Sequence, residues 1–318
     1  MRQQHLILAT LVFLLFSSNA ATSESQTLES VLNQHTRLMV FAPHPDDETL
    51  GAGGLIQRVL HMGGTVKVVF MTSGDGYPEG VMLEDHISHP KAQDYREYGK
   101  IREGEARRVL AALGVKENDL VFLAFPDGGL CYLAWKYWSD KRPYVSPYTK
   151  EDRPPPTDMI IPKTDYSGQD LKKEIVRVLS EFRPTLVSFT RHEDRHPDHC
   201  ATSLFVQEAL AELQGAVPPL RPQLCTYLIH FGDWPIGEES GFGSRLYPPK
   251  GFPLRDYKWT SLALTPQEAE TKHKALLLYD SQMLVLGRFL LSFSRANELF
   301  ILRGDAAEEL KRVRCCLP

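Results

Sequence analysis

Short apolar runs alternate with longer amphipathic stretches along most of the chain. Five such runs occupy residues 37–42, 65–71, 120–125, 185–190 and 223–230. Runs of this length are typical of strands that a parallel sheet buries on both faces. Apolar positions at helical spacing predict helices over residues 94–113, 169–182 and 198–213. The alternation predicts an α/β fold with a parallel sheet, helices on both faces, and functional groups at the carboxyl ends of the strands.

Two segments interrupt this alternation. Residues 131–164 are rich in aromatic side chains and contain three consecutive prolines, and residues 231–253 are rich in Gly, Pro and aromatics. Each is expected to be an insertion that either shapes the mouth of a substrate site or packs against its own side chains. Helices are expected again from Thr265. No repeat or clear linker divides the chain, so we expect one domain over residues 30–318 with insertions near 131–164 and 231–253.

The first twenty residues differ from the rest of the chain. Arg2 is their only charged residue, Leu6 to Phe16 form an apolar core, and Ser18-Asn19-Ala20 fits the small-x-small cleavage pattern. These features predict a signal peptide over residues 1–20, and therefore a secreted or periplasmic protein. The alternative is an uncleaved anchor. No stable membrane anchor is expected, because the apolar core is shorter than the roughly 20 residues that cross a bilayer.

The composition is that of an ordinary globular protein, with 42% hydrophobic and 24% charged residues in a chain of 318. Its 36 basic and 40 acidic residues give a net charge of −4, so no nucleic-acid partner is expected. The five cysteines form neither a disulfide framework nor a CxxC pair, and no disulfide is predicted. In an oxidising compartment, Cys315 or Cys316 could still bridge to another cysteine. The sequence does not fix the oligomeric state.

A cluster of chemically active residues follows the first apolar run. It reads His44-Pro45-Asp46-Asp47-Glu48 and lies where a strand should end and a helix should begin. Aspartate is a favoured N-cap residue, and its charge suits the helix dipole. Taken alone, the cluster is therefore as compatible with an elaborate helix cap as with a metal site.

A second cluster favours the metal site. Arg195-His196-Pro197-Asp198-His199 follows the apolar run at 185–190 and also precedes a helix. The two clusters can therefore occupy neighbouring loops at one edge of the sheet. A catalytic zinc ion takes three ligands of the His and carboxylate type and keeps a fourth position for water, whose pKa it lowers towards about 7. His44, Asp47 and His199 can supply such a set.

Other residues of the two clusters are candidates for catalytic roles. Asp46, a carboxylate that is not a ligand, can take the proton of the water. His196, if protonated, can stabilise the oxyanion or return the proton to the leaving amine. Asp198 can orient a histidine without binding the metal itself. The donor set suits Zn²⁺, although cobalt, nickel or iron can occupy similar sites.

Several shorter motifs accompany the two clusters in a fixed order along the chain. They are Ala52-Gly53-Gly54, Thr72-Ser73-Gly74, residues 102–106, residues 125–128, residues 274–276, Ser281-Gln282 and residues 295–300. Together with the clusters, they resemble the LmbE-like (PIG-L) family of zinc-dependent N-deacetylases over about residues 37–300. The resemblance implies a Rossmann-like three-layer αβα sandwich with a mostly parallel sheet and loop insertions.

The same resemblance implies roles for individual residues. His44, Asp47 and His199 become the metal ligands, Asp46 the general base, and His196 the residue that assists at the oxyanion. Arg102, Glu105 and Asp127 become candidates for contacts with sugar hydroxyls, although a solvated or paired helical charge and a turn-forming Asp-Gly are the competing explanations.

The remaining polar and glycine-rich positions carry weaker signals. Arg191, His192 and Asp194 lie just before the second cluster and either line the site or are ordinary polar loop residues. Five other histidines lack partners at recognisable spacing and are expected to be structural: His61, His86, His89, His230 and His273. The small residues at 51–54 match no phosphate-loop spacing and are expected to allow close packing of a helix on the sheet.

The leading hypothesis is a secreted zinc amidohydrolase that removes an acetyl or similar acyl group from a glucosamine-containing small molecule or glycan. A secreted carbohydrate-binding protein without turnover is one alternative, and a zinc amidase for a bulkier amide is another. An intact Asp46 weighs against the binding protein, which has no chemical need for a general base.

Overall fold

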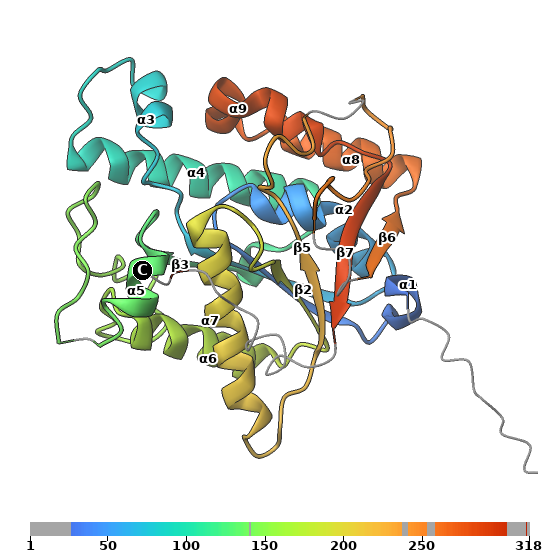
Figure 1. The fold of residues 1–318 in the computed structure, drawn as a ribbon, viewed down its shortest axis with the longest axis horizontal. Helices are drawn as coiled ribbons and strands as arrows, with labels where there is room; N and C mark the ends of the chain where they lie inside the picture. Colours follow the sequence, from blue (N-terminus) through green and yellow to red (C-terminus); the bar gives the residue numbers. More distant parts are fainter. Residues whose placement is uncertain (1–26, 140, 237–240, 253–257, 304–315, 317–318) are drawn as a thin grey trace, which may run out of the picture.

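A seven-stranded, mostly parallel sheet forms the centre of the computed structural model, which describes residues 27–139, 141–236, 241–252, 258–303 and 316 (Figure 1). The strands are β1 (Arg37–Ala42), β2 (Thr65–Thr72), β3 (Leu120–Phe125), β4 (Leu186–Thr190), β5 (Gln223–Tyr227), β6 (Trp259–Ala263) and β7 (Asn297–Arg303). Their order across the sheet is β3-β2-β1-β4-β5-β7-β6. The first five strands pair in parallel, and β7 is antiparallel to both β5 and β6.

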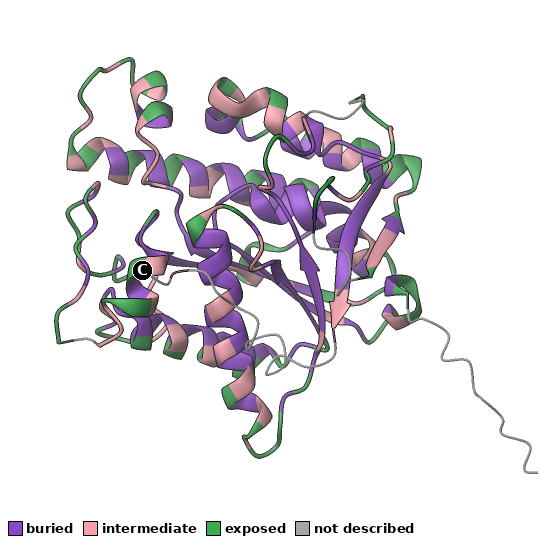
Figure 2. Ribbon diagram, viewed as in Figure 1, coloured by how far each residue is buried: buried purple, intermediate pink, exposed green. Residues whose placement is uncertain are grey.

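Helices cover both faces of the sheet. They are α1 (Leu28–Val31), α2 (Asp47–His61), α3 (Pro78–Glu84), α4 (Ala92–Ala112), α5 (Leu130–Trp135), α6 (Gly168–Phe182), α7 (Pro197–Gln214), α8 (Pro266–Leu276) and α9 (Asp280–Ser292). Helices α2, α4, α8 and α9 share one hydrophobic core, and α5, α6 and α7 share the other. Successive β1 residues alternate between the cores, because neighbouring side chains of a strand point to opposite faces. Figure 2 shows the strands of the sheet as largely buried. The structure confirms the expected α/β sandwich.

The antiparallel part of the sheet was not anticipated. The sequence analysis expected helices from Thr265 and identified neither β6 nor β7. Strand β6 has no fully apolar run, because it lies at the edge and only Leu262 of its five residues is buried. The expected apolar run at 223–230 also exceeds the strand, since β5 ends at Tyr227 and the buried Leu228 and Ile229 lie in the following loop.

Small residues let α2 lie close against its neighbours, as the sequence predicted. A Cβ atom at Gly51 would lie 2.1 Å from the ring of Tyr227, and one at Gly54 would lie 2.3 Å from Leu264. Both distances are far below van der Waals contact, so neither position accommodates a side chain without movement of its neighbours. This close packing fixes the position of α2, and therefore of Asp47, the first residue of the helix.

A buried ion pair also holds α2 in place. The Glu298 carboxylate, on β7, accepts hydrogen bonds from the backbone N–H groups of Gly54 (2.7 Å) and Leu55 (2.9 Å). It also accepts one from Lys272 Nζ at 2.7 Å, and Lys272 donates a further bond to the Leu50 carbonyl. Both charged side chains are at most 2% exposed, so each depends on the other for compensation of its charge.

The expected insertion at 131–164 contains α5 and then no further helix or strand among its described residues. Some of its aromatic rings pack against one another, as in the stacked pair Tyr132–Tyr144 at 5.7 Å, while Tyr132 and Trp135 stay 45% exposed. A disulfide joins Cys131 to Cys316, a pairing that the sequence did not predict.

The expected signal peptide lies outside the described residues. Within the part of the chain that the structure describes, no helix combines the length and apolar character needed to cross a membrane.

The buried ion pair predicts a large stability effect. Glu298→Gln leaves the Lys272 ammonium buried without its carboxylate, so we expect the free energy of unfolding to fall by about 3–5 kcal/mol. Urea unfolding followed by circular dichroism measures this free energy. The matched control is Glu270→Gln, which removes an exposed ion pair with Lys274 on α8 and should leave the unfolding midpoint in place. Equal midpoints for both variants and the parent would contradict the role of Glu298.

Candidate metal centre and active site

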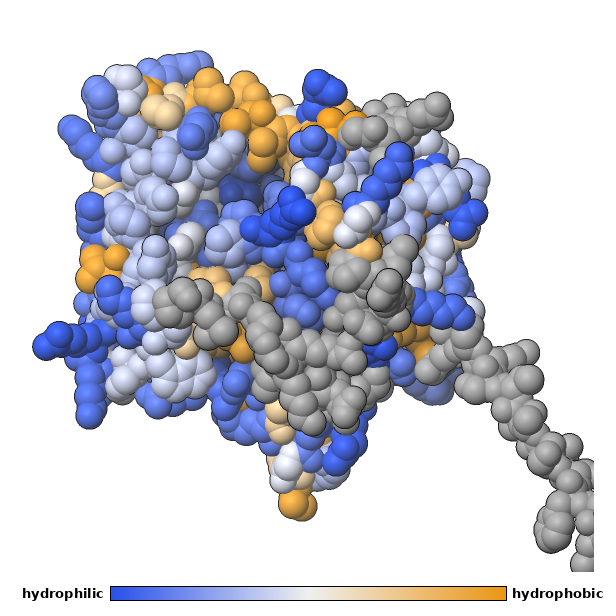
Figure 3. All heavy atoms as spheres, viewed as in Figure 1, coloured by the Kyte–Doolittle hydropathy of each residue, from blue (hydrophilic) through white to orange (hydrophobic). Residues whose placement is uncertain are grey.

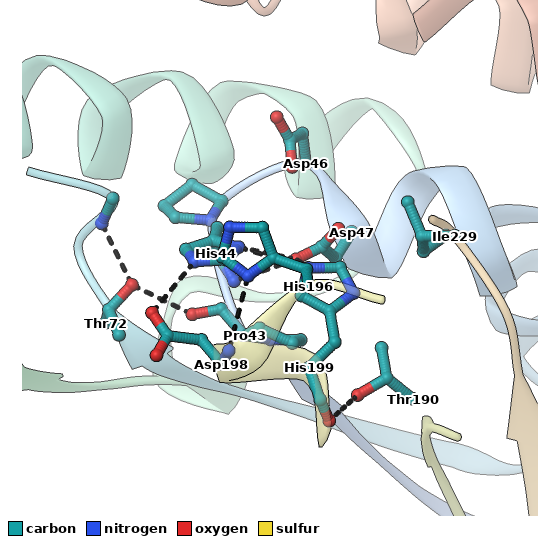
Figure 4. A network of polar contacts seen from close by, with 12 residues as sticks. Pro43, His44, Asp46, Asp47, Thr72, Thr190, His196, Asp198, His199 and Ile229 are labelled. Carbon is teal, nitrogen blue, oxygen red and sulfur yellow. Dashed lines mark hydrogen bonds and ion pairs between the residues drawn. The ribbon is translucent and has the colours of Figure 1, made fainter. Parts of the chain in front are cut away.

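Two loops at the carboxyl edge of the sheet form the site. One connects β1 to α2 and the other connects β4 to α7, and β1 pairs in parallel with β4. Their carboxyl ends are therefore side by side, with β2 on the other side of β1, where the order of the strands reverses. Ligands of open α/β sheets bind in the crevice at this position. Figure 4 shows the side chains of both loops converging there.

Three side-chain atoms meet at distances that suit a metal ion. Asp47 Oδ2 lies 3.1 Å from His44 Nδ1 and 3.1 Å from His199 Nε2, and the two nitrogens are 3.3 Å apart. A tetrahedral ion with bonds of about 2.1 Å holds its ligands about 3.4 Å apart. All three side chains are buried. The structure thus brings together the three residues that the sequence analysis assigned as ligands, and their donor atoms fit a divalent metal.

A carboxylate lies beside the outer ring nitrogen of each histidine. Asp194 Oδ2 lies 3.2 Å from His199 Nδ1, and Asp127 Oδ1 lies 3.2 Å from His44 Nε2. Each imidazole therefore presents its other nitrogen to the metal position, as in many metal sites. The Thr190 hydroxyl donates to the His199 carbonyl at 2.8 Å and fixes the backbone of that ligand. Asp194 was missed as a partner of His199, although its place two residues before His196 is a usable signal.

Asp198 contributes mainly to the geometry of a third loop. It accepts hydrogen bonds from the backbone N–H groups of Gly128 (2.6 Å) and Leu130 (3.1 Å), and its carboxylate is 3.5 Å from His44 Nε2. Asp127, in the same loop, is the nearer carboxylate to His44. The positioning of a histidine that was expected of Asp198 therefore falls largely to Asp127 and Asp194.

Asp46 is held in a strained conformation beside the metal position. Its φ of 132° is unusual for a residue with a side chain and costs of the order of 1–3 kcal/mol. Arg102 Nη2 lies 3.2 Å from Asp46 Oδ2. Burial raises the pKa of Asp46 to about 8, Arg102 opposes the rise, and the neighbouring Asp47 adds to it. A carboxyl that titrates near neutrality has the proton affinity that a general base requires.

His196 is placed to donate a hydrogen bond without carrying a charge. Its Nδ1 accepts from the backbone N–H of Asp198 at 3.3 Å, so the ring hydrogen resides on Nε2. Burial, together with the neighbouring imidazoles of His44 and His199, lowers the pKa of His196 to about 2. The sequence analysis considered a protonated His196, whereas this lowered pKa favours the neutral ring.

Residues of both clusters line a cavity of about 310 Å³. Its polar part includes His44, Asp46, Asp47, Arg102, Asp127 and His196, and its apolar part is formed by Leu50, Leu286, Phe289 and Leu290. Three of the apolar residues belong to α9. Figure 3 shows apolar residues on the molecular surface at this helix. The site thus offers polar groups for chemistry beside an apolar wall.

Two of the residues expected to contact substrate line this cavity. Arg102 and Asp127 line the cavity, although Arg102 is also held by the carbonyls of Gly74 and Pro45. Arg191 is not among the described residues that line it. Its guanidinium instead makes a two-pronged ion pair with Glu193 and a hydrogen bond to Thr226, which corrects the expectation that it faces the substrate.

His230, which the sequence analysis treated as structural, also belongs to the site. Its ring lies 4.8 Å from the ring of His199 and 5.4 Å from that of His196, and it stacks on Phe289 at 5.1 Å. It has no partner close in sequence, which is why spacing did not reveal it. The sequence signal that could have identified His230 was its position just after β5, whose carboxyl end lies at the same edge of the sheet as both clusters.

Solved structures with a similar fold include several deacetylases. N,N'-diacetylchitobiose deacetylase from Pyrococcus horikoshii aligns with a TM-score of 0.53 and 18% identity, covering 85% of this chain and 84% of that one. The zinc-inhibited form of teicoplanin deacetylase aligns with a TM-score of 0.52 and 19% identity, covering 84% and 97%. A 4-carboxy-2-hydroxymuconate hydratase shares the fold as well, with a TM-score of 0.50 and 13% identity, covering 84% and 95%. These similarities support the fold, which alone does not decide the reaction.

Two relatives with similar sequences carry the same enzyme description. A 1D-myo-inositol 2-acetamido-2-deoxy-alpha-D-glucopyranoside deacetylase from Mycobacterium sp. (strain JLS) is 28% identical over 210 residues, which cover 65% of this chain and 56% of that protein. The enzyme of the same description numbered 1 from Saccharopolyspora erythraea is 26% identical over 252 residues, covering 78% of each chain. The family model described as PIG-L, GlcNAc-PI de-N-acetylase, matches residues 39–210, more than half of the chain. The chain therefore belongs to the PIG-L family.

Proposed function

We propose that the protein is a zinc-dependent N-deacetylase that removes the acetyl group from a glucosamine unit of a GlcNAc-containing glycoconjugate. One observation carries the proposal: a three-atom ligand set, two of whose residues line the cavity, lies beside a buried carboxylate and a neutral imidazole donor that line the same cavity. Family membership and the names of the relatives agree with this activity.

The proposed chemistry assigns one task to each group. Zinc held by His44, Asp47 and His199 would activate water and polarise the amide carbonyl. Asp46 takes the proton of the attacking water, and Arg102 keeps its carboxylate in place. The Nε2–H of His196 donates to the oxyanion of the tetrahedral intermediate. The proton held by Asp46 then passes to the departing amine, which restores the carboxylate.

A bulkier amide is the second candidate substrate. The apolar wall of Leu286, Phe289 and Leu290 is larger than an acetyl methyl group needs, so it could accommodate a longer acyl chain. A binding protein without turnover is less well supported, because such a protein gains nothing from burying and straining Asp46.

We also propose that the protein is exported. The features of residues 1–20 support a cleaved signal peptide. The disulfide between Cys131 and Cys316 supports an oxidising compartment, where such bonds form and persist.

The general-base role predicts a separation between metal binding and activity. Asp46→Asn keeps the three ligands, so elemental analysis should find as much zinc as in the parent, while kcat for acetate release falls by about 10²–10⁴. His199→Ala should lose zinc and activity together. Asp119→Asn, at the opposite edge of the sheet, is the matched control and should behave like the parent. An active Asp46→Asn variant would exclude the proposed base.

The contact between Asp194 and His199 predicts an effect on metal affinity. Asp194→Asn removes the charge that orients His199, so zinc affinity measured by competition with a chelator should fall by about 10- to 100-fold. Asp119→Asn again serves as the control. A metal-free melting temperature close to that of the parent would show that the loss reflects the ligand and not unfolding, whereas unchanged affinity would argue against the positioning role.

Export predicts a shortened mature chain. Expressed with its full sequence in a bacterium, the protein should appear outside the cytoplasm with a mature N-terminus after Ala20. N-terminal sequencing of the fractionated protein measures this. A full-length N-terminus in the cytoplasmic fraction would contradict the proposal.

A further inference from the structure

Asp46 occupies the N-cap position of α2, where an aspartate side chain usually accepts a hydrogen bond from the first turn of the helix. Here the Asp46 carboxylate makes no such bond. Its Oδ2 instead lies 3.2 Å from Arg102 Nη2, and the residue lines the catalytic cavity. The carboxylate is therefore not used as a cap, and the backbone at this end of the helix depends on other contacts.

The Glu48 side chain supplies one of these contacts. The backbone N–H of Asp46 donates to Glu48 Oε2 at 3.1 Å. In the usual capping box, a Glu at the third helical position caps this N–H group, whereas Glu48 stands at the second. The helix itself offers no acceptor, because the N–H groups at its amino end have no partner within the helix. Glu48 thus holds the backbone of Asp46 and leaves the Asp46 carboxylate to the cavity.

This bond matters because the backbone of Asp46 is strained. A φ of 132° is rarely adopted by a residue with a side chain, and such a conformation persists only where surrounding contacts over-determine it. The Asp46 carbonyl accepts from the N–H groups of Thr49 (3.0 Å) and Leu50 (2.9 Å), bonds that the start of any helix provides. The bond to Glu48 comes from a side chain, so a substitution can remove it selectively.

Tyr279 contacts the Glu48 carboxylate from a distant part of the chain. Glu48 Oε1 accepts hydrogen bonds from the hydroxyl groups of Thr49 and Tyr279. Thr49 is the next residue of α2, whereas Tyr279 lies between α8 and α9, 231 residues further along. Glu48 and Tyr279 are both 0% exposed, so bulk water does not compete for this bond. Among the described residues, Tyr279 is the only hydrogen-bond donor to this carboxylate from outside α2 and its N-cap.

The backbone of Tyr279 is fixed by the start of α9. Its carbonyl accepts from the N–H groups of Gln282 (3.0 Å) and Met283 (2.7 Å), and its own N–H donates to the Leu276 carbonyl at 3.3 Å. Helix α9 also carries most of the apolar wall of the cavity. The Tyr279 hydroxyl therefore connects this helix, through Glu48, to the backbone of the proposed base.

We propose that Tyr279 and Glu48 are positioning residues for the general base. The Tyr279 hydroxyl orients the Glu48 carboxylate, which holds the Asp46 backbone so that the Asp46 carboxylate stays beside the metal position and available to the attacking water. Neither positioning residue is among the described residues that line the catalytic cavity. The inference rests on the proposed deacetylase function and deepens it, since it names residues on which the base depends.

Exchange of the Asp46 amide hydrogen tests the positioning role without turnover. Tyr279→Phe removes only the hydroxyl, so the amide of the zinc-loaded protein should exchange with deuterium about tenfold faster than in the parent, the effect of weakening one hydrogen bond. Nuclear magnetic resonance measures this rate. Tyr166→Phe is the matched control, because Tyr166 is 3% exposed and its hydroxyl donates to the Ala124 carbonyl at 2.9 Å. That variant should leave the Asp46 exchange rate unchanged.

Steady-state kinetics distinguish positioning from a general loss of structure. With the methyl glycoside of N-acetylglucosamine, Tyr279→Phe should lower kcat for acetate release about tenfold, while KM and zinc content stay at the parent values. Glu48→Gln keeps the size of the side chain but has one acceptor oxygen where Glu48 has two, so it should lower kcat in the same way. Tyr166→Phe should have the kcat of the parent.

A double-mutant cycle shows whether Tyr279 acts through Asp46. In the Asp46→Asn background the base is already absent, so Tyr279→Phe should change the remaining kcat by less than about twofold. A structural effect independent of Asp46 would lower kcat by the same factor in both backgrounds, and that result would overturn the proposal.

The exchange rate and the kinetics also separate this inference from the proposed function. If the parent releases no acetate but the Asp46 amide responds to Tyr279→Phe and not to Tyr166→Phe, the contact with the Asp46 backbone stands and the proposed function fails. If the parent is active and neither exchange nor kcat responds to Tyr279→Phe, the positioning role is overturned and the function stands. A response of only one of these two quantities in the active enzyme overturns the positioning role as well.

Discussion

The parallel pairing of β1 with β4 is the constraint on which the site depends. His44 and Asp47 are separated from His199 by about 150 residues of chain, yet their three donor atoms lie within 3.3 Å of one another. This convergence needs two strands that end at the same edge and two loops that each turn directly into a helix. The pairing of Leu38 with Leu186 sets that register. A shift of one residue would turn the side chains of one strand to the opposite face of the sheet.

Such a site concentrates negative charge in the interior, and the surrounding structure compensates for it. Burial alone would raise the pKa of Asp47, but the charge and hydrogen bonds of His199 and His44 hold it well below its usual range. Glu48, buried beside it, accepts hydrogen bonds from Thr49 and from the Tyr279 hydroxyl. The ion pair of Glu298 with Lys272 then fixes the helix that carries these carboxylates. The polar site is therefore tied to a polar network that extends to β7 and α8.

The sequence predicted those parts of the structure whose signals are local. Apolar runs marked the parallel strands, and helical spacing located α4, α6 and α7 to within two residues of their ends. The two clusters were recognisable because each gathers several reactive side chains within five positions. Strand β6 was missed because an edge strand needs no continuous apolar run.

The contacts that the sequence did not reveal join residues that are far apart in the chain. His230 meets His199 only because β5 lies beside β4. Asp194 was visible as a polar loop residue, but its role depends on which nitrogen of His199 faces the metal position. The pairing of Cys131 with Cys316 spans 185 residues, and no spacing rule distinguishes it from the other pairings of five cysteines.

The residues of the proposed reaction and the apolar wall of the cavity come from different parts of the chain. The proposed ligands, Asp46 and His196 come from two strand-to-helix connections and the first turns of α2 and α7, within the region that matches the PIG-L model. Three of the four apolar residues that line the cavity, Leu286, Phe289 and Leu290, come from α9, outside that region. The side chains of this wall can change without disturbing the ligands, because they contribute no donor atom to the three-atom ligand set. Family membership therefore constrains the chemistry of this protein more strongly than its substrate, whose features have to be inferred from the walls of the catalytic cavity.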